Sequence, residues 1–293
     1  MLTDATALAA EFDRHRSRLI GLAYRLTGRV ADAEDAVQEA WLRLAAERSE
    51  IRELGAWLTT VVSRICLDQM RSAAVRRERY VGPWLPEPLV ADVDDPQDVV
   101  ATRDDLRMAA LRVLHELPPD QRLAFVLHDA FDVPFAEIAE VLGCAVATAR
   151  QHASRGRRAM AAADPAPRVP LPEQQEVLGA FLSAVSSGDL AAITRVLHPD
   201  AVFVGDSDGK ARTARREILG AEKIALFITG LFDKYGPGLY DGLRPVAVNG
   251  DLGLVLPEGP EVDARVVVFS VRAGLVAEIF DIANPDKIAH VVI

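Results

Sequence analysis

Residues 32–44, DAEDAVQEAWLRL, are the stretch that decides the fold of the N-terminal part of this chain. Their apolar residues recur at steps of three and one, which is the spacing of one face of an α-helix. This face comprises Ala33, Ala36, Val37, Ala40, Trp41 and Leu44. The pattern predicts an amphipathic helix that packs the stripe into a helical core.

A second line of residues lies on the opposite side of the same helix. It comprises Asp35, Gln38, Glu39 and Leu42, and we call it the docking surface. It combines acidic side chains with an exposed leucine. Spacing alone leaves two interpretations open, a solvated helix face and a surface that binds a partner.

Helices are predicted on both sides of this stretch, over residues 7–28, closed by Gly28, and over 56–71, AWLTTVVSRICLDQMR. The second of these turns Leu58, Val61, Val62 and Ile65 inward. Its other side carries hydroxyl groups and arginine, which suit contacts with DNA phosphates and bases. These DNA candidates are Thr60, Ser63, Arg64 and Arg71, followed by Arg76 and Arg77. A solvated face is the alternative, but the arginine cluster favours DNA.

The composition indicates a globular protein of two or three domains, with 293 residues, 50% apolar and 26% charged. No apolar run reaches membrane-spanning length, and charges occur throughout the first twenty residues. We therefore expect no signal peptide, no membrane association and a cytoplasmic location. Cys66 and Cys144 lie far apart without a partner motif. We expect no disulfide, no metal site and no cofactor.

The net charge of −10 is unevenly distributed along the chain. Residues 80–105 carry seven acidic side chains and one basic one, and the C-terminal third holds most of the remaining acidic excess. Arginine instead clusters within residues 71–79 and 150–158. Because clustered arginine attracts phosphate whatever the net charge, the acidic balance does not exclude a nucleic-acid partner.

Residues 80–105 are predicted to form a linker. Four prolines prevent a long helix there, and the acidic side chains repel one another. The linker begins with WLPEP at residues 84–88. A tryptophan in an extended segment is expected to find an apolar partner.

Residues 106–163 are predicted to form a second helical unit. Two helices are separated at Pro118-Pro119, and two more surround a tight turn at Gly143, as in a helix-turn-helix. The last helix has a seam of small residues at Ala149 and Ala153. Its outer face suits the major groove and comprises Thr148, Arg150, Gln151, Ser154, Arg155 and Arg158.

Residues 171–293 follow a proline-rich joint and show a mixed pattern. Helices are predicted at 174–186, 191–197 and 216–232, with a strand at 201–206. Strands then follow near 244–248, 252–256, 264–270 and 276–282. This order predicts an α+β cone.

The helical part resembles a known family. YRLTG at 24–28, with the helices at 32–44 and 56–71, resembles region 2 of extracytoplasmic-function (ECF) sigma factors. LPPDQRLAFVLHDAFDVPFAEIAEVLG at 117–143 resembles sigma region 4. The resemblance implies that the docking surface binds the clamp helices of the β′ subunit of core RNA polymerase. It also implies that region 2 opens the −10 promoter element and region 4 reads the −35 element. His152 and Gly156 replace the arginine and alanine usual in the family, so promoter preference is not transferred.

The C-terminal part resembles SnoaL-like domains, small cones with an apolar cavity, through residues 179–206. Three phrases resemble the SigJ-like subgroup of ECF sigma factors with a fused SnoaL-like domain: WLPEP, DSDGK at 206–210 and NPDKI at 284–288. In that subgroup the extra domain regulates the sigma factor in cis, in place of a separate anti-sigma protein. The residues implied as regulatory contacts are Trp84, Leu85, Pro86, Asp206, Asp208, Gly209, Lys210, Asn284, Pro285, Asp286 and Lys287.

The interpretation is a multi-domain sigma factor that binds core polymerase and directs promoter-specific initiation. Its parts are all-α region 2 (1–79), the linker (80–105), all-α region 4 (106–163) and an α+β SnoaL-like regulatory domain (171–293). We expect WLPEP, or the region 2 surface beside it, to pack on the DSDGK and NPDKI turns in a resting state. The alternative is that both turns serve only the cone.

Two other function classes stay open. In one, the C-terminal domain is an enzyme for a small polar aromatic or polyketide-like substrate, which requires an acid–base pair in one cavity. The residues considered are His198, Asp206, Asp208, Lys210, Asp281, Asp286 and His290, and no catalytic residue is assigned. In the other, the chain is a ligand-sensing repressor that never meets polymerase. A small-molecule ligand in the cavity is compatible with all three interpretations.

Overall fold

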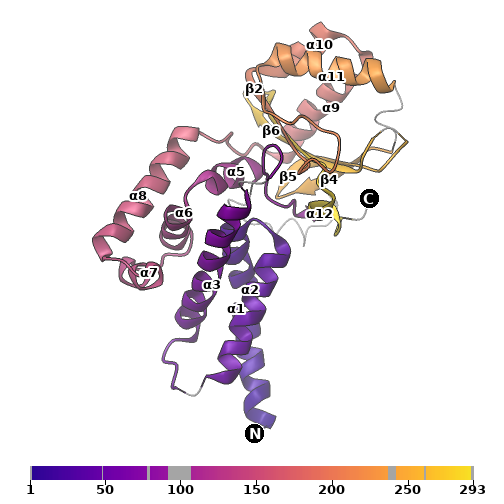
Figure 1. The fold of residues 1–293 in the computed structure, drawn as a ribbon. Coiled ribbons are helices and arrows are strands. Elements are labelled where there is room, and N and C mark those ends of the chain that lie inside the picture. The colour runs from indigo at the N-terminus through magenta and orange to yellow at the C-terminus, as the bar shows by residue number, and fades with distance from the viewer. Residues whose placement is uncertain are drawn as a thin grey trace. The chain divides into compact units, whose positions relative to one another are not determined.

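The computed structural model describes residues 2–47, 49–77, 80–91, 107–236, 242–260 and 262–291, excluding the side chains of 2–5 and 73–77. The chain forms two compact units (Figure 1). The first comprises Met1–Arg79 and Val113–Asp164, and the second comprises Tyr80–Arg112 and Pro165–Ile293. The described parts of the expected linker therefore belong to the C-terminal unit instead of standing apart.

The first unit begins with three helices, α1 (Leu2–Thr27), α2 (Val30–Ala46) and α3 (Leu54–Arg77). The stripe predicted on α2 is confirmed, because Ala33, Ala36, Val37, Ala40 and Leu44 are all buried. Trp41 is half-buried, with its ring 5.1 Å from that of Phe12. Gly28 ends α1 with φ of 73°, a conformation that glycine adopts without strain.

The helices that follow are α5 (Met108–Glu116), whose residues up to Arg112 belong to the second unit, then α6 (Pro119–Phe125), the π-helical turn η1 (Val126–Ala130), α7 (Phe135–Leu142) and α8 (Val146–Ala163) of the first unit. Gly143 forms the turn between α7 and α8 with φ of 65°. Gly156 lies where α8 packs on α6, since a Cβ there would come within 2.8 Å of the Phe125 Cβ atom. This close approach explains a glycine in mid-helix.

The second unit contains a seven-stranded sheet in the order β1-β4-β5-β6-β7-β2-β3. The pairing of β2 with β7 is parallel and all the others are antiparallel. The strands are β1 (Val90–Ala91), β2 (Leu197–Asp206), β3 (Ile218–Leu219), β4 (Arg244–Val248), β5 (Asp251–Leu256), β6 (Arg265–Arg272) and β7 (Leu275–Ile282). The helices are α9 (Leu171–Ser187), α10 (Leu190–Val196), α11 (Ala221–Tyr235) and α12 (Pro285–Ile288). The expected α+β class is confirmed.

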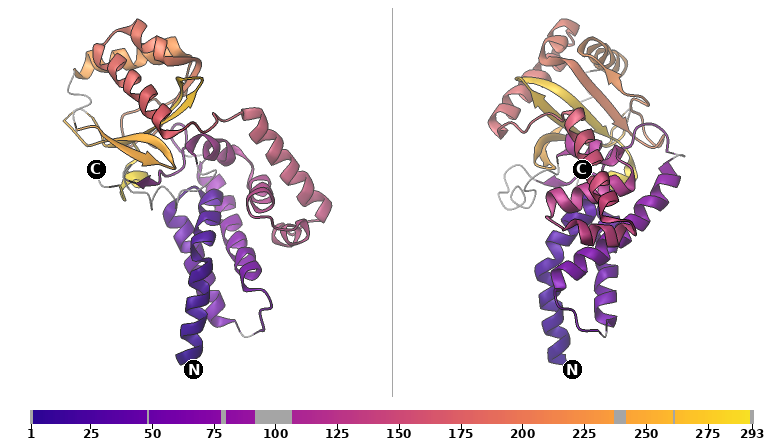
Figure 2. Two further views of the ribbon diagram at one scale, coloured as in Figure 1. Left: turned by 180° about the vertical axis from the view of Figure 1, so that it is seen from behind. Right: turned by 90° about the vertical axis from the view of Figure 1, so that its left-hand side faces the viewer.

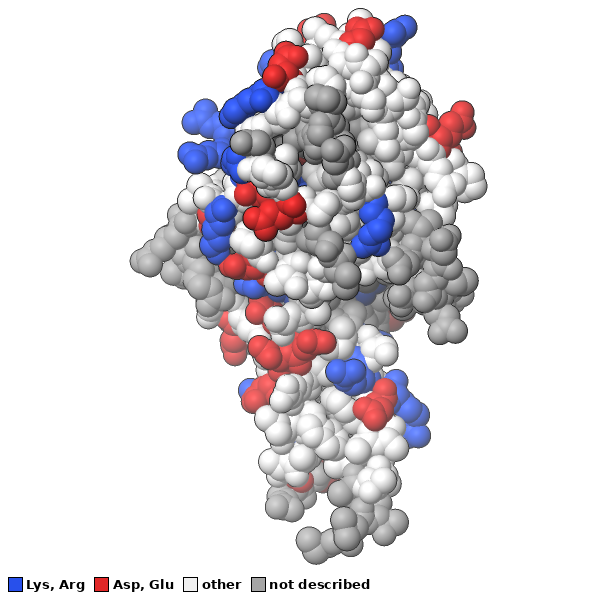
Figure 3. All heavy atoms as spheres, turned by 90° about the vertical axis from the view of Figure 1, so that its right-hand side faces the viewer, with Lys and Arg blue, Asp and Glu red and all other residues white. Residues whose placement is uncertain are grey.

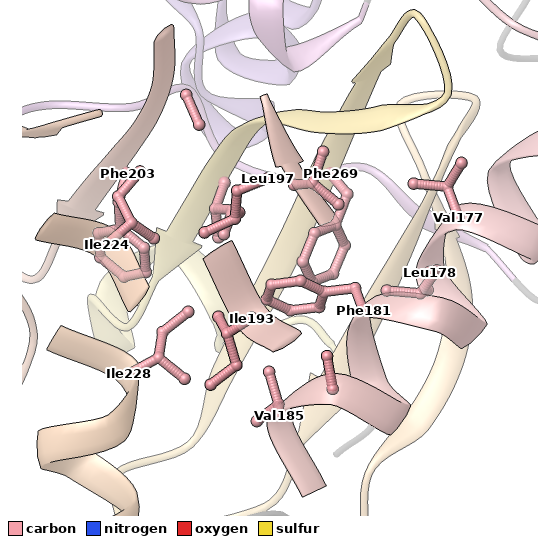
Figure 4. Packing of buried hydrophobic residues seen from close by; sticks show 14 of the residues in the cluster. Val177, Leu178, Phe181, Val185, Ile193, Leu197, Phe203, Ile224, Ile228 and Phe269 are labelled. Carbon is pink, nitrogen blue, oxygen red and sulfur yellow. The ribbon is translucent and has the colours of Figure 1, made fainter. Parts of the chain in front are cut away.

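Both faces of this sheet are buried. Helices α9, α10 and α11 lie on one face (Figures 1 and 2), where they enclose the core shown in Figure 4. Neighbouring strand residues alternate between the faces, so Ile279 joins this core and Phe280 joins a second core on the other side. The second core also contains Leu85, Met108 and Ile288. Leu85 of the linker, Met108 at the start of α5 and Ile288 of α12 therefore cover the face that helices α9, α10 and α11 leave open.

Three details differ from the sequence prediction. The helix expected at 216–232 begins only at Ala221, because residues 218–219 pair with β2 and Gly220 has φ of 92°. Strand β1 lies inside the expected linker, and α12 follows the last strand. Both elements were missed, since neither is long enough to produce a periodic pattern.

Candidate polymerase, promoter and linker-binding surfaces

The docking surface lies on the side of α2 opposite the core. Asp35, Gln38 and Leu42 are exposed, Leu42 by 55%, and Glu39 is half-buried. Glu39 Oε1 accepts a hydrogen bond from Arg43 Nε at 2.9 Å. An exposed leucine between acidic groups suits a partner with an apolar patch and basic side chains.

The DNA candidates on α3 divide into two groups. Arg64 and Arg71 are exposed and Thr60 is half-buried. Arg71 Nη2 donates to Asp120 Oδ1 at 3.0 Å. The orientation predicted for Ser63 is wrong, because Ser63 is fully buried. The side chains of Arg76 and Arg77, at the end of α3, lie outside the described residues.

The reason for the error at Ser63 is the phase of the helix. The buried residues of α3 include Thr59, Val62, Ser63, Cys66, Leu67 and Met70. This stripe is rotated from the predicted one, so a small hydroxyl residue occupies a core position. The Ser63 Oγ atom has no hydrogen-bond partner among the described residues.

The outer face of α8 agrees with the predicted DNA candidates in exposure. Arg150, Gln151, Arg155 and Arg158 are exposed, and Thr148 and Ser154 are half-buried. Ala149, Ala153 and Gly156 are buried on the opposite side. The Arg150 guanidinium lies 5.7 Å from the Phe135 ring centroid, which supports its side chain without using its charge in an ion pair.

Charges of both signs occur on the face of the molecule drawn in Figure 3. The arginines predicted to contact DNA are clustered on α3 and α8, within a chain whose net charge is −10.

A buried arginine joins the two helical regions of the first unit, and sequence reasoning missed it. Arg122 on α6 is 4% exposed. Its guanidinium donates to the carbonyl oxygens of Leu114, His115 and Leu117, and Nη1 donates to Leu26 O at 2.8 Å. These carbonyls lie at or near helix C-termini, where a cation is favourable. The sequence feature that could have identified Arg122 is its position within the apolar run that α6 contributes to the core.

The end of β2 holds the start of the linker through a fully buried carboxylate. Asp206 Oδ1 accepts a hydrogen bond from Tyr80 Oη, and Oδ2 accepts from Leu85 N at 2.6 Å. Oδ2 also accepts from Lys287 Nζ at 2.6 Å. Asn284 Nδ2 donates to Tyr80 Oη at 2.7 Å. We call Tyr80, Leu85, Asp206, Asn284 and Lys287 the linker clamp.

Lys287 is the centre of the clamp. It is 2% exposed, and its Nζ also donates to Leu85 O. The same ammonium group lies 4.2 Å from the Trp84 ring centroid and 5.1 Å from that of Tyr80. Burial, reinforced by the Asp206 carboxylate, raises the pKa of Tyr80 well above its usual value, so the hydroxyl remains a donor.

A second layer of contacts joins the same segments at the surface. Asp208 Oδ1 accepts from Val81 N at 3.2 Å, and Gly209 packs against the Val81 side chain. Lys210 Nζ pairs with Asp286. Asn284 caps α12 by accepting from Asp286 N at 3.1 Å. Pro86 is buried, whereas Pro285 is exposed. The structure thus brings the three sequence phrases together on the second unit.

Further contacts that anchor the linker, at Leu89, and the start of region 4, at Arg107, were not predicted. Leu89 N donates to Asn249 Oδ1 at 3.0 Å, and Asn249 N donates to Leu89 O at 2.9 Å. Arg107 Nε donates to both oxygens of Asp251, at 3.1 and 2.8 Å. Burial raises the pKa of Asp251, and the Arg107 guanidinium opposes the rise. The sequence offered only polar residues in a turn before a buried strand. This pattern is too common to identify the residues that such a turn contacts.

The cone contains a cavity of about 560 Å³ between α9, α11 and the sheet. Of the residues considered for catalysis, Lys210 and Asp281 line it. Asp206 and His290 instead contact the linker, and His198 Nδ1 accepts from Asp200 N in a local turn. No histidine occurs among the described residues that line the cavity, so the His/Asp pair that would support the enzyme alternative is not found among them.

Comparisons with known proteins agree with this arrangement. The family model for sigma-70 region 2 matches residues 12–76, and that for sigma-70 region 4 matches residues 107–160. The ECF RNA polymerase sigma factor SigJ of Mycobacterium tuberculosis (strain H37Rv) is 51% identical over 288 residues, covering 95% of this chain and 92% of SigJ. A probable ECF RNA polymerase sigma factor, SigI, of the same organism is 36% identical over 220 residues, 74% of each chain.

The fold comparison extends over nearly the whole chain. The crystal structure of M. tuberculosis SigJ matches with a TM-score of 0.79 and 47% identity, covering 96% of this chain and 98% of that one. No helix among the described residues has the length and apolar character needed to cross a membrane. Both sigma regions and the C-terminal mixed-sheet unit are thus matched together in one relative, and this chain belongs to the family of ECF RNA polymerase sigma factors.

Proposed function

We propose that this sigma factor directs core RNA polymerase to promoters through the surfaces described above and that its C-terminal unit regulates it in cis. The docking surface on α2 binds the clamp helices of the β′ subunit. The arginine-bearing faces of α3 and α8 contact the −10 and −35 elements. The observation that carries the regulatory part is the buried Lys287, which joins Asp206 to the Leu85 carbonyl in the linker.

The linker supports a regulatory role because it connects region 2 to region 4. A free acidic linker would let the two regions sample many separations, and promoter recognition requires one. Here residues 80–91 and 107–112 are both part of the C-terminal unit. Holding or releasing these segments changes the population of molecules that can engage both elements, which is a population shift.

The test is in vitro transcription with core polymerase, on a promoter selected from random DNA by the wild-type holoenzyme. Trp84→Ala, Asn284→Ala and Asp286→Ala in the full-length chain are expected to change the initiation rate while leaving core polymerase binding intact. Point variants are preferable to removing residues 284–293, because that truncation also removes Ile288 from the second core. Activities equal to wild type in all three variants would end the regulatory part of the proposal.

Regulation in cis also predicts that no separate anti-sigma protein is needed to silence the chain. Purified wild-type protein is expected to initiate more slowly than the most active clamp variant, with only core polymerase and promoter present. Equal rates would instead assign the silencing to another protein.

A second candidate function, ligand sensing by the cone, is favoured by the cavity next to the linker-binding turns. It does not replace the sigma activity, since a ligand would act on the same held linker.

A further inference from the structure

The cavity of the C-terminal unit has the size and lining of a small-molecule site. Its volume of about 560 Å³ falls in the usual range for such sites. Four phenylalanines line it, and two pairs contact each other: Phe181 with Phe269, with ring centroids 5.5 Å apart, and Phe203 with Phe227, 5.1 Å apart. Figure 4 shows Phe181 and Phe269 facing each other between α9 and the sheet. Such walls favour a flat apolar occupant.

Among the described residues that line the cavity, one buried side-chain oxygen lacks a hydrogen-bond partner. Asp281 on β7 is 3% exposed, and its Oδ2 accepts from Thr213 Oγ1 at 2.5 Å and from Arg265 Nη1 at 2.9 Å. Its Oδ1 is buried and has no hydrogen-bond partner among the described residues. Because buried acceptors are normally paired, this oxygen indicates a missing donor.

The charge of Asp281 defines the kind of donor. Arg265 balances the carboxylate and is itself held, with Nε on Asp263 O and Nη2 on Arg212 O. An additional cation is therefore not required, and a neutral hydroxyl group satisfies Oδ1. A ring system that carries one hydroxyl group meets both the apolar walls and this acceptor.

The wall of the cavity is shared with the linker contacts. The loop at 207–215 lines the cavity through Lys210, Ala211, Arg212, Thr213 and Arg215. The same loop contacts the linker, since Asp208 accepts from Val81 N and the Arg215 backbone packs near Gly82. Asp281 pairs in register with Gly205, next to Asp206 of the linker clamp.

We propose that the cavity binds a hydroxylated aromatic molecule through Asp281 Oδ1, and that its occupancy stabilises the loop at 207–215 and with it the held linker. The effect of the bound molecule on the linker rests on the proposed function. A ligand that binds the held state more tightly than the released state shifts the population toward the held state by linkage. The molecule is thus a co-repressor of initiation.

The first experiment compares 1-naphthol with naphthalene, binding to the full-length chain by titration calorimetry or fluorescence. The wild type is expected to bind both, and 1-naphthol roughly five- to tenfold more tightly, the difference that one hydrogen bond contributes. In Asp281→Asn the amide oxygen is expected to keep the contacts with Thr213 and Arg265, which leaves the NH2 group at the position of Oδ1. This variant is therefore expected to lose the preference for 1-naphthol over naphthalene. Circular dichroism checks that this variant is folded.

A matched pair of variants on α11 keeps the test independent of Asp281. Leu231 lines the cavity, whereas Leu226 on the same helix is 59% exposed and does not line it. Leu231→Trp is expected to weaken both compounds at least tenfold, and Leu226→Trp to leave both unchanged. No binding of either compound to the wild type, or equal loss in both tryptophan variants, overturns the site.

The coupling is tested by hydrogen–deuterium exchange. Saturating 1-naphthol is expected to slow exchange in residues 80–91 at least threefold in the wild type and not in Leu231→Trp. Binding without any slowing overturns the coupling. The proposed function fails separately: unchanged transcription in the clamp variants, with 1-naphthol still bound, rejects regulation by the linker and leaves the binding site standing.

Discussion

Replacing Lys287 by methionine isolates the energy with which the clamp holds the linker. Methionine keeps an unbranched apolar side chain and removes the ammonium group from a side chain that is 3% exposed. Asp206 then loses its buried ion pair, and Leu85 O loses a donor. Breaking a buried pair by removing one partner costs about 3–5 kcal/mol, because the remaining charge stays desolvated.

Release of the linker lets water reach Asp206 and the Leu85 carbonyl, and in the limit it relieves this whole cost. At about 1.4 kcal/mol per factor of ten, the released population is expected to rise by roughly one hundred to several thousand times. Urea unfolding measures the loss of stability, and hydrogen–deuterium exchange of residues 80–91 measures local release. Initiation on the selected promoter is expected to change in the same variant.

Lys210 supplies the matched control, since it pairs with Asp286 at the same surface but is 43% exposed. Lys210→Met is expected to cost at most about 1 kcal/mol, because water screens exposed pairs. A double variant, Lys287→Met with Asp206→Asn, removes both charges and is expected to recover much of the lost stability. If Lys287→Met costs no more than Lys210→Met, the reasoning about the buried pair is refuted.

Four further predictions concern other residues of the molecule. Alanine at all four positions of the docking surface should weaken binding to core polymerase, most visibly at low salt, with an unchanged circular dichroism spectrum; unchanged affinity would contradict the assignment. Arg155→Ala should cost about 1–3 kcal/mol in promoter binding if it reads a base, whereas a phosphate contact would weaken all sequences alike and lower the salt slope. Gly156→Ala should destabilise by about 1–3 kcal/mol through overpacking against α6, although alanine is the better helix former by about 1 kcal/mol; stabilisation in urea unfolding would show that the helices can move apart. Since the pKa of Tyr80 is raised in the folded state, its contribution to stability is full below pH 10 and is lost as the pH rises from there toward the raised pKa; ultraviolet titration should show a late-ionising tyrosine component that Tyr80→Phe removes.

The helix faces that are defined by periodic burial of side chains could be predicted from the sequence. The stripe on α2 and the exposed face of α8 follow from the helical repeat, because most core positions there carry apolar or small residues. On α3 the apolar repeat is weaker. The buried stripe there includes Ser63 and is rotated from the predicted stripe. A small polar residue can occupy a packed position, and no spacing rule distinguishes it from a surface residue.

The polar contacts were predictable only in part. The three phrases of the subgroup indicated which turns meet the linker, but not that Lys287 is buried between Asp206 and Leu85. Arg122 and Arg107 were missed because their partners are defined by the fold: Leu26 O is 96 positions away from Arg122, and Asp251 is 144 positions away from Arg107. Every residue has a backbone carbonyl, so the sequence does not show which carbonyl accepts the hydrogen bond of a buried arginine.

The core on the second face of the sheet has a consequence for how such proteins arise. Leu85 comes from the linker and Met108 from the first residues of region 4, yet both complete a core most of whose other members lie in residues 165–293. A gene fusion that attached only residues 171–293 to another sigma factor would leave an apolar sheet face open to water and prone to association. The heritable module is therefore the C-terminal fold together with the linker that covers it. Recombination within this group is expected to exchange the two as one piece, although region 4 lies between them in the chain.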